Sequence, residues 1–435
     1  MAICFGGFMS LGIRSQYTEQ CNFFGTNDPR KLIEQFGSPL YVYNENILRK
    51  RCKELVSLSN YRGFGVNYSV KANANPYLLK IVREEGLVVD AMSPGELAID
   101  QMAGFSKDKI LYISNNNSVE ELLNAVKNCA LVSVDSLSQL ETFGKISPNS
   151  KVMIRLNPGV GAGHHAKVIT AGKYTKFGIS LDSLDEVFSL VDKYNLVLAG
   201  INQHIGSLFM DPDGYLEAAK ILLDIGSKLP VNILKNIEVI DFGGGFGIPY
   251  HKYDEEKRLD MEKLGESLHS LISEWADKHG YLGRFLVEPG RYVMAECGIL
   301  LGSVNATKNN GGKRYVGTDI GFNVLVRPAM YDSFHDIEIY NDISKNEKRE
   351  ILSQIIVGNI CESGDILAKD RDLPEFFVGD VIGLLDAGAY GFSMSSSYNQ
   401  RFRPAEVCIT SDGKARLIRR RETIEDLCSM YQGLI

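Results

Sequence analysis

The feature that most constrains the fold is a regular alternation of short β-rich runs with helical patterns up to about Leu300. Alternating strands and helices predict parallel strands that are joined by helical crossovers. Eight such units predict a (β/α)8 barrel rather than an open sheet. The eight predicted strands are residues 65–70, 87–89, 110–113, 131–134, 152–156, 196–201, 238–240 and 285–287.

Helix start signals support this alternation. Glu121 follows Ser118 by three residues, and Gln139 follows Ser136 by the same interval, each pair in front of an apolar run. Such pairs are typical of capping boxes, in which each side chain accepts a hydrogen bond from the backbone N–H of the other residue. We therefore expect a helix and a capping box at both places.

Beyond about Leu300 the helical periodicity fades, and β-rich segments separated by turns follow. Ser411-Asp412-Gly413 is typical of a hairpin turn between two of these segments. We expect a mostly antiparallel β domain, to which an early strand at residues 40–43 also belongs. The predicted strands of the C-terminal part are residues 314–317, 354–357, 378–385, 406–410 and 415–418.

These patterns predict a division of the 435 residues into three parts. Residues 1–43 form an N-terminal extension whose strand joins the β domain. Residues 44–300 form the barrel, and residues 301–435 form the β domain. A chain of this length exceeds one ordinary domain core, which is consistent with a large barrel and a second domain.

Charge and cysteine content limit the possible partners. The formal net charge of −7 argues against nucleic acid and anionic membranes as partners, because both attract basic surfaces. No apolar run approaches the roughly 18 residues that span a bilayer. The first ten residues lack the basic start and the cleavage site of a signal peptide. Eight cysteines lie scattered without a C-x-x-C pair, which favours free thiols in the cytoplasm over disulfides or a metal site.

Polar residues stand at or just past the carboxyl end of each predicted barrel strand. Barrel enzymes assemble their active sites from these ends and from the loops that follow them. A single polar residue at a strand end is unremarkable, but a lysine, a histidine and a glutamate on three ends favour a functional site. In chain order the residues are Lys71, Asp90, Ser114/Asn115, Asp135, Arg155, His204, Asp241 and Glu288.

A glycine-rich loop, residues 241–247, follows the seventh predicted strand. Glycines allow backbone N–H groups to approach an anion closely, so Gly243, Gly244 and Gly245 are candidates to hold a phosphate. The spacing matches neither the nucleotide-binding G-x-x-x-x-G-K-[ST] loop nor the G-x-G-x-x-G dinucleotide fingerprint. A tight turn of the barrel with no ligand is the alternative interpretation.

Taken together, these strand ends offer the groups that pyridoxal phosphate requires. Lys71 is an amine that could bind the cofactor aldehyde, although an ordinary exposed lysine remains the alternative. Ser207 and the glycines could hold the phosphate, and His204 offers a flat ring. Glu288 is placed to pair with the pyridine nitrogen, and it begins the segment Glu288-Pro289-Gly290-Arg291.

Three dense segments mark the C-terminal part. Arg327-Pro328-Ala329-Met330-Tyr331 carries a cation and a phenol, and Ala387-Gly388-Ala389-Tyr390-Gly391 carries a second phenol. Cys361-Glu362-Ser363-Gly364-Asp365 places a thiol between turn-forming and acidic residues. A lone cysteine is usually inert core, but this setting favours an accessible, functional thiol.

In these segments the chain resembles the fold-type III decarboxylases that use pyridoxal phosphate, and among them the diaminopimelate decarboxylase family most closely. The resemblance covers residues from about Pro39 to Arg421, with the segments in the order of the family. They are Tyr68-x-x-Lys71-Ala72-Asn73, His204-Ile205-Gly206-Ser207, Gly243-Gly244-Gly245-Phe246-Gly247-Ile248-Pro249-Tyr250, Glu288-Pro289-Gly290-Arg291, Arg327-Pro328-Ala329-Met330-Tyr331, Cys361-Glu362-Ser363-Gly364-Asp365 and Gly388-Ala389-Tyr390-Gly391.

The resemblance implies a role for each of these groups. Catalysis falls to Lys71, which binds the cofactor covalently, to His204, which stacks on its ring, and to Cys361, the proton donor. The implied cofactor-binding residues are Lys71, His204, Ser207, Gly243, Gly244, Gly245, Glu288, Gly290, Arg291 and Tyr390. The implied substrate-binding residues are Arg291, Arg327, Tyr331, Glu362 and Tyr390. No metal is implied, and a homodimer is expected because Cys361 completes the active site of the partner subunit.

The implied reaction is decarboxylation of meso-2,6-diaminopimelate to L-lysine and CO2, the last step of lysine biosynthesis. Glu362 follows the cysteine where the related ornithine and arginine decarboxylases have Asp, which favours this substrate. The alternatives are a decarboxylase of the same fold that acts on D-lysine, D-ornithine or carboxynorspermidine, an amino-acid racemase, and a non-catalytic regulator that binds pyridoxal phosphate. The presence of both Lys71 and Cys361 argues against the regulator.

The chain departs from the family pattern in two places. Leu208 stands where the family often has Gln, and Thr318-Asp319-Ile320-Gly321 replaces a more usual Asp-Ala-Gly stretch. The first 38 residues have no clear counterpart. His164 and His165 lie in a glycine-rich stretch after the fifth strand, where we expect a loop near the entrance of the site.

Overall fold

The computed structural model describes residues 11–159, 162–163, 175–341 and 349–434, so His164 and His165 lie outside the described residues. The chain forms two compact units. The barrel unit comprises Arg49–Pro249 and Lys257–Val293. The sheet unit comprises Met1–Leu48, Tyr250–Glu256 and Met294–Ile435. The predicted domain boundaries at residues 43 and 300 stay a prediction.

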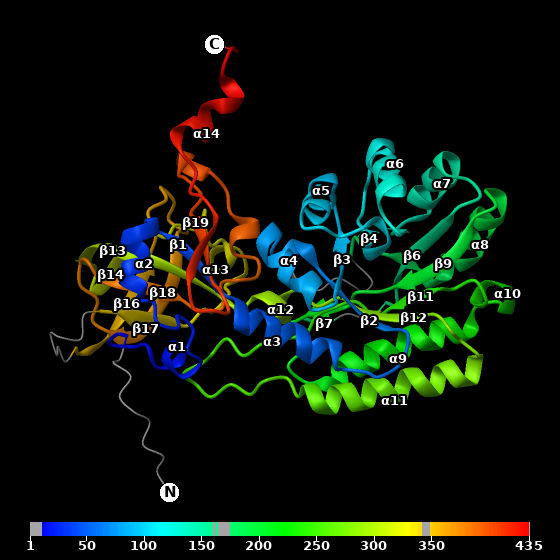
Figure 1. Cartoon of the computed structure of the whole chain (residues 1–435), viewed down its shortest axis with the longest axis horizontal. Helices are drawn as coiled ribbons and strands as arrows, with labels where there is room; N and C mark the ends of the chain where they lie inside the picture. The colour runs from blue at the N-terminus through cyan, green and yellow to red at the C-terminus, as the bar shows by residue number, and fades with distance from the viewer. Residues whose placement is uncertain (1–10, 160–161, 164–174, 342–348, 435) are drawn as a thin grey trace, which may run out of the picture. The chain divides into compact units, whose positions relative to one another are not determined.

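The barrel unit contains a closed ring of eight parallel strands (Figure 1). The ring closes because β5 pairs with β6 at one side and the remaining strands complete the path between them. This confirms the predicted (β/α)8 barrel. In spatial order the strands are β5 (Leu131–Val134), β4 (Ile110–Ile113), β3 (Val88–Ala91), β2 (Phe64–Tyr68), β12 (Arg284–Val287), β11 (Val239–Asp241), β9 (Val197–Asn202) and β6 (Lys151–Asn157).

Helices alternate with these strands along the chain and lie outside them in Figure 1. Their buried faces are apolar; in α9, for example, Leu222 and Leu223 are buried. The helices are α3 (Glu45–Val56), α4 (Pro76–Glu84), α5 (Pro94–Met102), α6 (Val119–Asn128), α7 (Leu137–Ile146), α8 (Leu184–Lys193), α9 (Pro212–Lys228), α10 (Val231–Leu234) and α11 (Met261–His279).

One of the two predicted capping boxes is present. At the start of α6, Ser118 Oγ accepts from Glu121 N–H, and Glu121 Oε2 accepts from Ser118 N–H at 2.8 Å. At the start of α7, Ser136 caps Gln139 N–H, but the reciprocal half is missing and that part of the prediction is wrong. The reason is that the Gln139 amide binds the backbone of Asn117 in the preceding strand-to-helix loop instead.

The barrel interior is apolar in its lower layers and polar toward the carboxyl ends of the strands. Alternate strand residues point inward, so the side chains of the core come from every second position. Leu286 and Val239 belong to the apolar cluster, and two residues further along these strands stand Glu288 and Asp241. The other members of the apolar cluster are Leu111, Ile113, Leu131, Met153 and Ala199.

The sheet unit is built on nine strands that pair mostly antiparallel. The parallel pairs among them are β1 with β19 and β14 with β16. The predicted β domain with its N-terminal strand is therefore confirmed. Its strands are β1 (Leu40–Asn44), β13 (Gly298–Asn310), β14 (Lys313–Thr318), β15 (Ile337–Tyr340), β16 (Ile351–Val357), β17 (Ile366–Pro374), β18 (Val381–Leu384), β19 (Ala405–Ile409) and β20 (Ala415–Arg419).

Strands β13, β15 and β17 were not expected from the sequence. The outer half of β13 is exposed and polar, and β17 carries four charged residues in its nine, so neither strand is apolar over its whole length. Both strands are fixed by pairing with neighbours rather than by their own pattern, because β-propensity depends strongly on context. β15 has only four residues.

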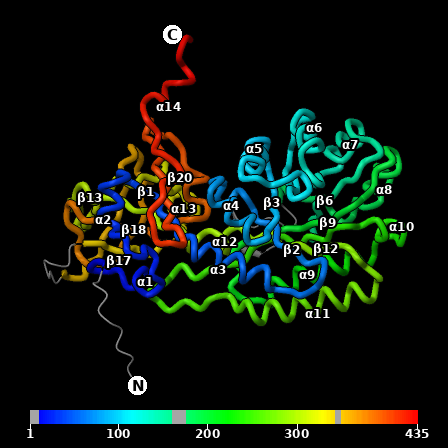
Figure 2. The backbone as a smooth tube through the Cα atoms, in the orientation of Figure 1, coloured from blue at the N-terminus to red at the C-terminus, as the bar shows by residue number. Residues whose placement is uncertain are grey.

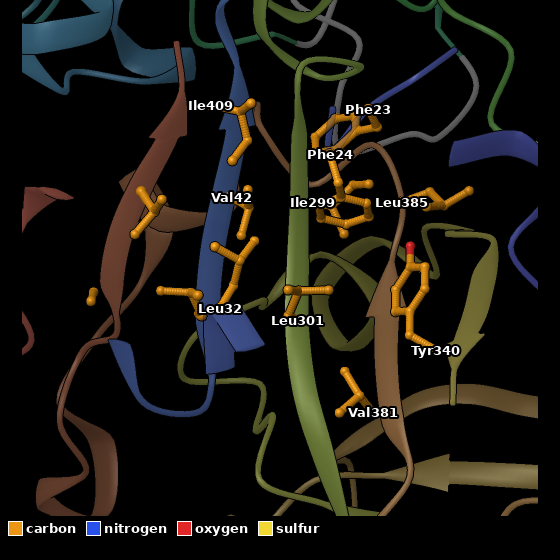
Figure 3. Close-up of a cluster of buried hydrophobic side chains, with 13 residues drawn as sticks. Phe23, Phe24, Leu32, Val42, Ile299, Leu301, Tyr340, Val381, Leu385 and Ile409 are labelled. Carbon is orange, nitrogen blue, oxygen red and sulfur yellow. The ribbon is translucent and has the colours of Figure 1, made fainter. Parts of the chain in front are cut away.

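The core of the sheet unit joins segments that are far apart in the sequence. Val42 on β1 and Ile299 and Leu301 on β13 are buried together with Phe23 and Phe24 (Figure 3). β1 pairs with β13 on one side and with β19 on the other, so the N-terminal and C-terminal segments of the chain lie side by side (Figure 2).

The N-terminal segment is anchored through Glu338 on β15. Its buried carboxylate accepts hydrogen bonds from the Tyr17 N–H at 3.0 Å and from the Thr18 hydroxyl and N–H at the start of α1 (Gln16–Gln20). It also accepts from the hydroxyls of Tyr253 at 2.6 Å and Tyr340 at 2.8 Å. The segment therefore packs on the sheet although it lacks a counterpart in the family pattern.

Among the described residues, no helix combines the length and the apolar character needed to span a bilayer.

Candidate active site

Lys71 lies in a short 3-10 turn, Val70–Ala72, directly after β2. Asp90, near the end of the neighbouring strand β3, holds the turn through two hydrogen bonds. One carboxylate oxygen of Asp90 accepts from the Val70 N–H at 2.9 Å, and the other accepts from the Ser69 hydroxyl at 3.1 Å. Ser69 and Val70 are the two residues that precede Lys71, so their hydrogen bonds to Asp90 fix the backbone that carries the amine. Lys71 itself is half-buried.

The charges of this region interact strongly. Burial raises the pKa of Asp90 well above its usual value, the charge of Glu288 raises it further, and Lys71 opposes both. The positive charge of Lys71 also lowers the pKa values of Glu288 and of His204. The structure therefore brings Lys71, Asp90, His204 and Glu288 together, as the strand-end pattern predicts.

Glu288 is a buried acid that lacks a complete set of partners. Its Oε2 lies 4.0 Å from His204 Nδ1, and its Oε1 has no hydrogen-bond partner in the described part of the chain. Burial and the neighbouring Asp241 raise the pKa of Glu288 well above its usual value, whereas Lys71 and Arg155 lower it. A buried carboxyl oxygen without a partner is costly, so a donor supplied by a ligand would stabilise it.

His204 presents a neutral ring. Its Nδ1 accepts a hydrogen bond from the Gly244 N–H at 3.1 Å, so that nitrogen carries no proton. Burial lowers the pKa of His204 well below its usual value, and the charges of Lys71 and Arg155 lower it further. A flat, uncharged ring on this side of the site is suited to stacking on a planar ligand.

The glycine-rich loop after β11 needs its glycines on steric grounds. A Cβ on Gly244 would lie 1.9 Å from the Glu288 carbonyl oxygen, and one on Gly243 would lie 2.3 Å from the Gln203 carbonyl oxygen. Gly243 also has a φ of +75°, which side chains disfavour. The loop is therefore a tight turn of the barrel. Such a turn can also hold a ligand, so the structure is compatible with both interpretations of the sequence, a tight turn and a phosphate-binding loop.

Ser207 and Arg291 meet beside this loop. The Arg291 guanidinium donates to Ser207 Oγ at 3.0 Å, and Arg291 is buried. The next residue, Leu208, has a φ of +69°, so the position where the family often has Gln adopts a left-handed backbone. A hydroxyl, a guanidinium and a backbone N–H form a typical phosphate-binding set. Gly243 N–H donates to Asp241 Oδ1 and Gly244 N–H donates to His204, so Gly245 is the glycine that could add an N–H to this set.

Several buried polar residues of the barrel were not assigned a role from the sequence. Asn67 on β2 is fully buried. Neither the oxygen nor the nitrogen of its side-chain amide has a hydrogen-bond partner among the described residues. Arg155 is half-buried, and the charges of Glu288 and Asp135 act on its guanidinium. A polar residue inside an otherwise apolar strand is the signal that could have identified Asn67, whereas Arg155 already stood among the strand-end residues.

The sheet unit carries the remaining predicted residues. Arg327 and Tyr331 lie at the two ends of α13 (Arg327–Tyr331), and the Arg327 guanidinium is buried against His335. Tyr390 is half-buried, with a φ of +57°. Their contacts with a substrate stay predictions.

The cysteine loop is exposed, as the sequence predicts. Cys361 N–H donates to Asn399 Oδ1 at 2.8 Å, while its side chain faces solvent. Glu362 is exposed and accepts from the Tyr398 hydroxyl. Asp365 is buried and fixes the loop by accepting from the N–H groups of Phe322 and Ile360. The loop therefore has a fixed backbone and an accessible thiol.

Comparisons with known proteins agree with this geometry. The family described as "Pyridoxal-dependent decarboxylase, pyridoxal binding domain" matches residues 47–295. The diaminopimelate decarboxylase of Methanothermobacter thermautotrophicus is 41% identical over 408 residues, which cover 93% of this chain and 94% of that protein. The enzyme of the same name from Escherichia coli strain K12 is 32% identical, over 92% of this chain and 95% of that protein.

The chain belongs to the diaminopimelate decarboxylase family.

Solved structures of diaminopimelate decarboxylases share the fold. One has a TM-score of 0.84 at 31% identity and covers 94% of this chain and 99% of its own. The enzyme from Helicobacter pylori in complex with L-lysine also has a TM-score of 0.84, at 29% identity, with 93% of this chain and 99% of that chain covered. A lysine/ornithine decarboxylase from Vibrio vulnificus is 20% identical, with a TM-score of 0.75, and this comparison shows similarity of fold only.

Pyridoxal phosphate, the cofactor of this family, fits the barrel residues. The buried Oε1 of Glu288 has no hydrogen-bond partner among the described residues, and a protonated ring nitrogen of the cofactor would supply a donor for it. Gly244 lies so close to the Glu288 backbone that no side chain fits there, which keeps the glycine-rich loop next to the strand end that carries Glu288. Within the described residues, no set of three His, Cys, Asp or Glu side chains could hold a metal ion.

Proposed function

We propose that this chain decarboxylates meso-2,6-diaminopimelate to L-lysine and CO2 with pyridoxal phosphate as cofactor. The observation that carries the proposal is the cluster of Lys71, His204 and buried Glu288 around a glycine loop, in a chain that is 41% identical to a diaminopimelate decarboxylase. The L-lysine bound in the related Helicobacter pylori structure is the product of this reaction.

The barrel residues divide the work of holding the cofactor. When bound, pyridoxal phosphate accepts the electrons that the departing carboxylate leaves behind. Lys71 supplies the amine for its aldehyde, and Ser207, Arg291 and Gly245 of the glycine-rich loop bind its phosphate. His204 packs on the ring. Glu288 keeps a proton at the ring nitrogen, which is electrostatic stabilisation at the point where charge develops.

Substrate selection falls to Arg291 of the barrel unit and to four residues of the sheet unit in this proposal. Diaminopimelate carries a second carboxylate and a second ammonium at its far end. Arg291 and Arg327 suit the carboxylate and Glu362 suits the ammonium, while Tyr331 and Tyr390 add hydroxyl contacts. Charged partners discriminate strongly, because a substrate without the matching group leaves them unpaired.

We also propose a homodimer in which Cys361 of one subunit protonates the substrate carbon in the active site of its partner. The exposed thiol on a fixed loop supports this role. The free cysteines among the described residues also support a location in the reducing cytoplasm.

The substrate is tested by assays of CO2 release with meso-diaminopimelate, D-lysine, D-ornithine and carboxynorspermidine at equal concentration. We expect turnover with meso-diaminopimelate and little with the others. An absorbance spectrum before and after substrate addition reports whether the cofactor responds. Turnover restricted to D-lysine or D-ornithine would contradict the substrate assignment.

Sharing of active sites is tested by mixing two inactive variants. Lys71→Ala and Cys361→Ala each damage every site of their own dimer. In a mixed dimer one of the two sites has both residues intact, so random mixing restores about a quarter of the wild-type activity. No recovery after verified subunit exchange would mean that each subunit uses its own Cys361.

A further inference from the structure

Arg327 is held by a histidine that has no assigned role. Both residues are almost completely buried, with 3% of Arg327 and 2% of His335 exposed. Arg327 Nη1 lies 3.0 Å from His335 Nε2, and His335 Nδ1 lies 2.7 Å from the Leu385 carbonyl oxygen. The imidazole therefore bridges α13 and the residue that follows β18.

These two contacts determine the protonation of the ring. A carbonyl oxygen can only accept a hydrogen bond, so Nδ1 of His335 must carry the proton. A guanidinium can only donate, so Nε2 must offer its lone pair to Arg327. His335 is therefore neutral, with its proton on Nδ1, and it is an acceptor of fixed direction for the arginine.

Tyr250 completes the support. Its ring centroid lies 5.0 Å from the guanidinium carbon of Arg327, within the range of a cation–π contact. The same ring meets His335 edge to face, with centroids 5.6 Å apart and an interplanar angle of 84°. The guanidinium is thus held at one edge by a lone pair and on one face by an aromatic ring, which leaves little freedom for its direction.

We propose that His335 is the positioning residue for Arg327 and thereby a determinant of substrate specificity. The proposal rests on the proposed function, in which Arg327 binds the second carboxylate of the substrate. A long arginine side chain loses rotational freedom on binding a carboxylate. His335 removes that freedom in advance, so the carboxylate meets a guanidinium that already has the required direction.

The proposal predicts which kinetic constant changes. The second carboxylate lies far from the carbon that loses CO2, so its contact with Arg327 contributes mainly to binding. Loss of an interaction that is equal in the ground state and the transition state raises KM and leaves kcat nearly unchanged. A purely structural role for His335 would instead lower the amount of folded enzyme and affect all substrates equally.

Two substitutions separate the two hydrogen bonds of the ring. His335→Asn places an amide near the position of Nδ1, so it keeps the bond to Leu385 O and removes the acceptor for Arg327. His335→Gln reaches the position of Nε2 and restores an acceptor there. We expect His335→Asn to raise KM for meso-diaminopimelate about tenfold, the effect of one charge-assisted hydrogen bond, and His335→Gln to recover most of that loss. Equal KM values for the two variants would contradict the proposal.

The second control is the background without the arginine. In Arg327→Ala, the further change His335→Asn should leave KM unchanged, because the group that it positions is gone. An undiminished effect of His335→Asn in that background would overturn the proposal.

A crystal structure of His335→Asn gives a readout that does not depend on the reaction. We expect the Arg327 guanidinium to leave its place over the Tyr250 ring, and an unmoved guanidinium would refute the positioning role whatever the substrate is. If the wild-type enzyme fails to turn over meso-diaminopimelate, the proposed function is wrong, while this structure still decides the role of His335.

Discussion

The two units treat a buried glutamate in opposite ways. Glu338 of the sheet unit accepts hydrogen bonds from two backbone N–H groups and three hydroxyls. Glu288 of the barrel unit leaves one carboxyl oxygen without a partner among the described residues. Burial raises the pKa of both acids. A satisfied buried acid holds a fold together, whereas an unsatisfied one marks a place where a ligand supplies the missing donor.

Replacement of Lys71 is expected to have the largest effect. In Lys71→Ala the amine that binds the cofactor aldehyde is absent, so turnover should fall by about 10³-fold or more, as when a covalent nucleophile is removed. The visible absorbance of the bound cofactor should disappear, while circular dichroism shows the fold intact. A fully active Lys71→Ala variant would remove the basis for a cofactor site in the barrel unit.

Glu288→Gln tests whether the buried glutamate of the barrel unit serves activity rather than stability. The amide cannot keep a proton at the ring nitrogen, so we expect kcat to fall by about 10²- to 10³-fold, the range for loss of one preorganised electrostatic contact. Stability should be unchanged or slightly higher, because an uncharged amide replaces a buried acid whose Oε1 has no hydrogen-bond partner among the described residues. Steady-state kinetics and urea unfolding of the same preparations measure both effects; a large loss of stability would show that Glu288 acts as Glu338 does.

Glu338→Gln tests whether the buried glutamate of the sheet unit serves stability rather than activity. The amide nitrogen cannot accept, so several of the donors around it lose their partner, and the free energy of unfolding should fall by about 1–3 kcal/mol. Activity per folded molecule should remain within about twofold at a temperature below the unfolding transition. The matched variant Tyr340→Phe removes a single donor and should cost less.

Asp100 on α5 is a further buried acid, and its effect on stability should depend on pH. Neither of its carboxyl oxygens has a partner among the described residues, and burial, with the charges of Asp90 and Glu96, raises its pKa to about 9. The folded state therefore holds a proton that the unfolded state releases at lower pH, and this stabilisation is lost as the pH rises from about 4 toward about 9.

Asp100→Asn mimics the protonated acid and should remove this pH dependence. Between about pH 6 and pH 8 its stability relative to wild type should increase by up to about 1.4 kcal/mol per pH unit. Urea unfolding of both proteins at several pH values measures the difference. Parallel pH profiles would mean that Asp100 is ionised in the folded protein.

The barrel could be predicted from the sequence because its strands are buried on both faces and appear as apolar runs, each ending in a polar residue. Lys71, His204 and Glu288 were identified because they stand at those ends. Strands β13 and β17 were missed although each pairs with the neighbouring strand in the chain, because the outer half of β13 is polar and exposed and β17 carries four charged residues in its nine. His335 was missed because its function depends on contacts with Arg327 and Leu385 that only the folded chain creates.

The pairing of β1 has a consequence for the order of events during synthesis. β1 leaves the ribosome before both of its partner strands, because Leu40 pairs with Leu301 on one side and with Ala405 on the other. The continuous stretches that form the barrel unit are complete long before Ala405 is made. Both edges of β1 are unpaired until β13 emerges, and one edge stays unpaired until β19 emerges, so the nascent β1 is a site where a chaperone would protect the chain from aggregation.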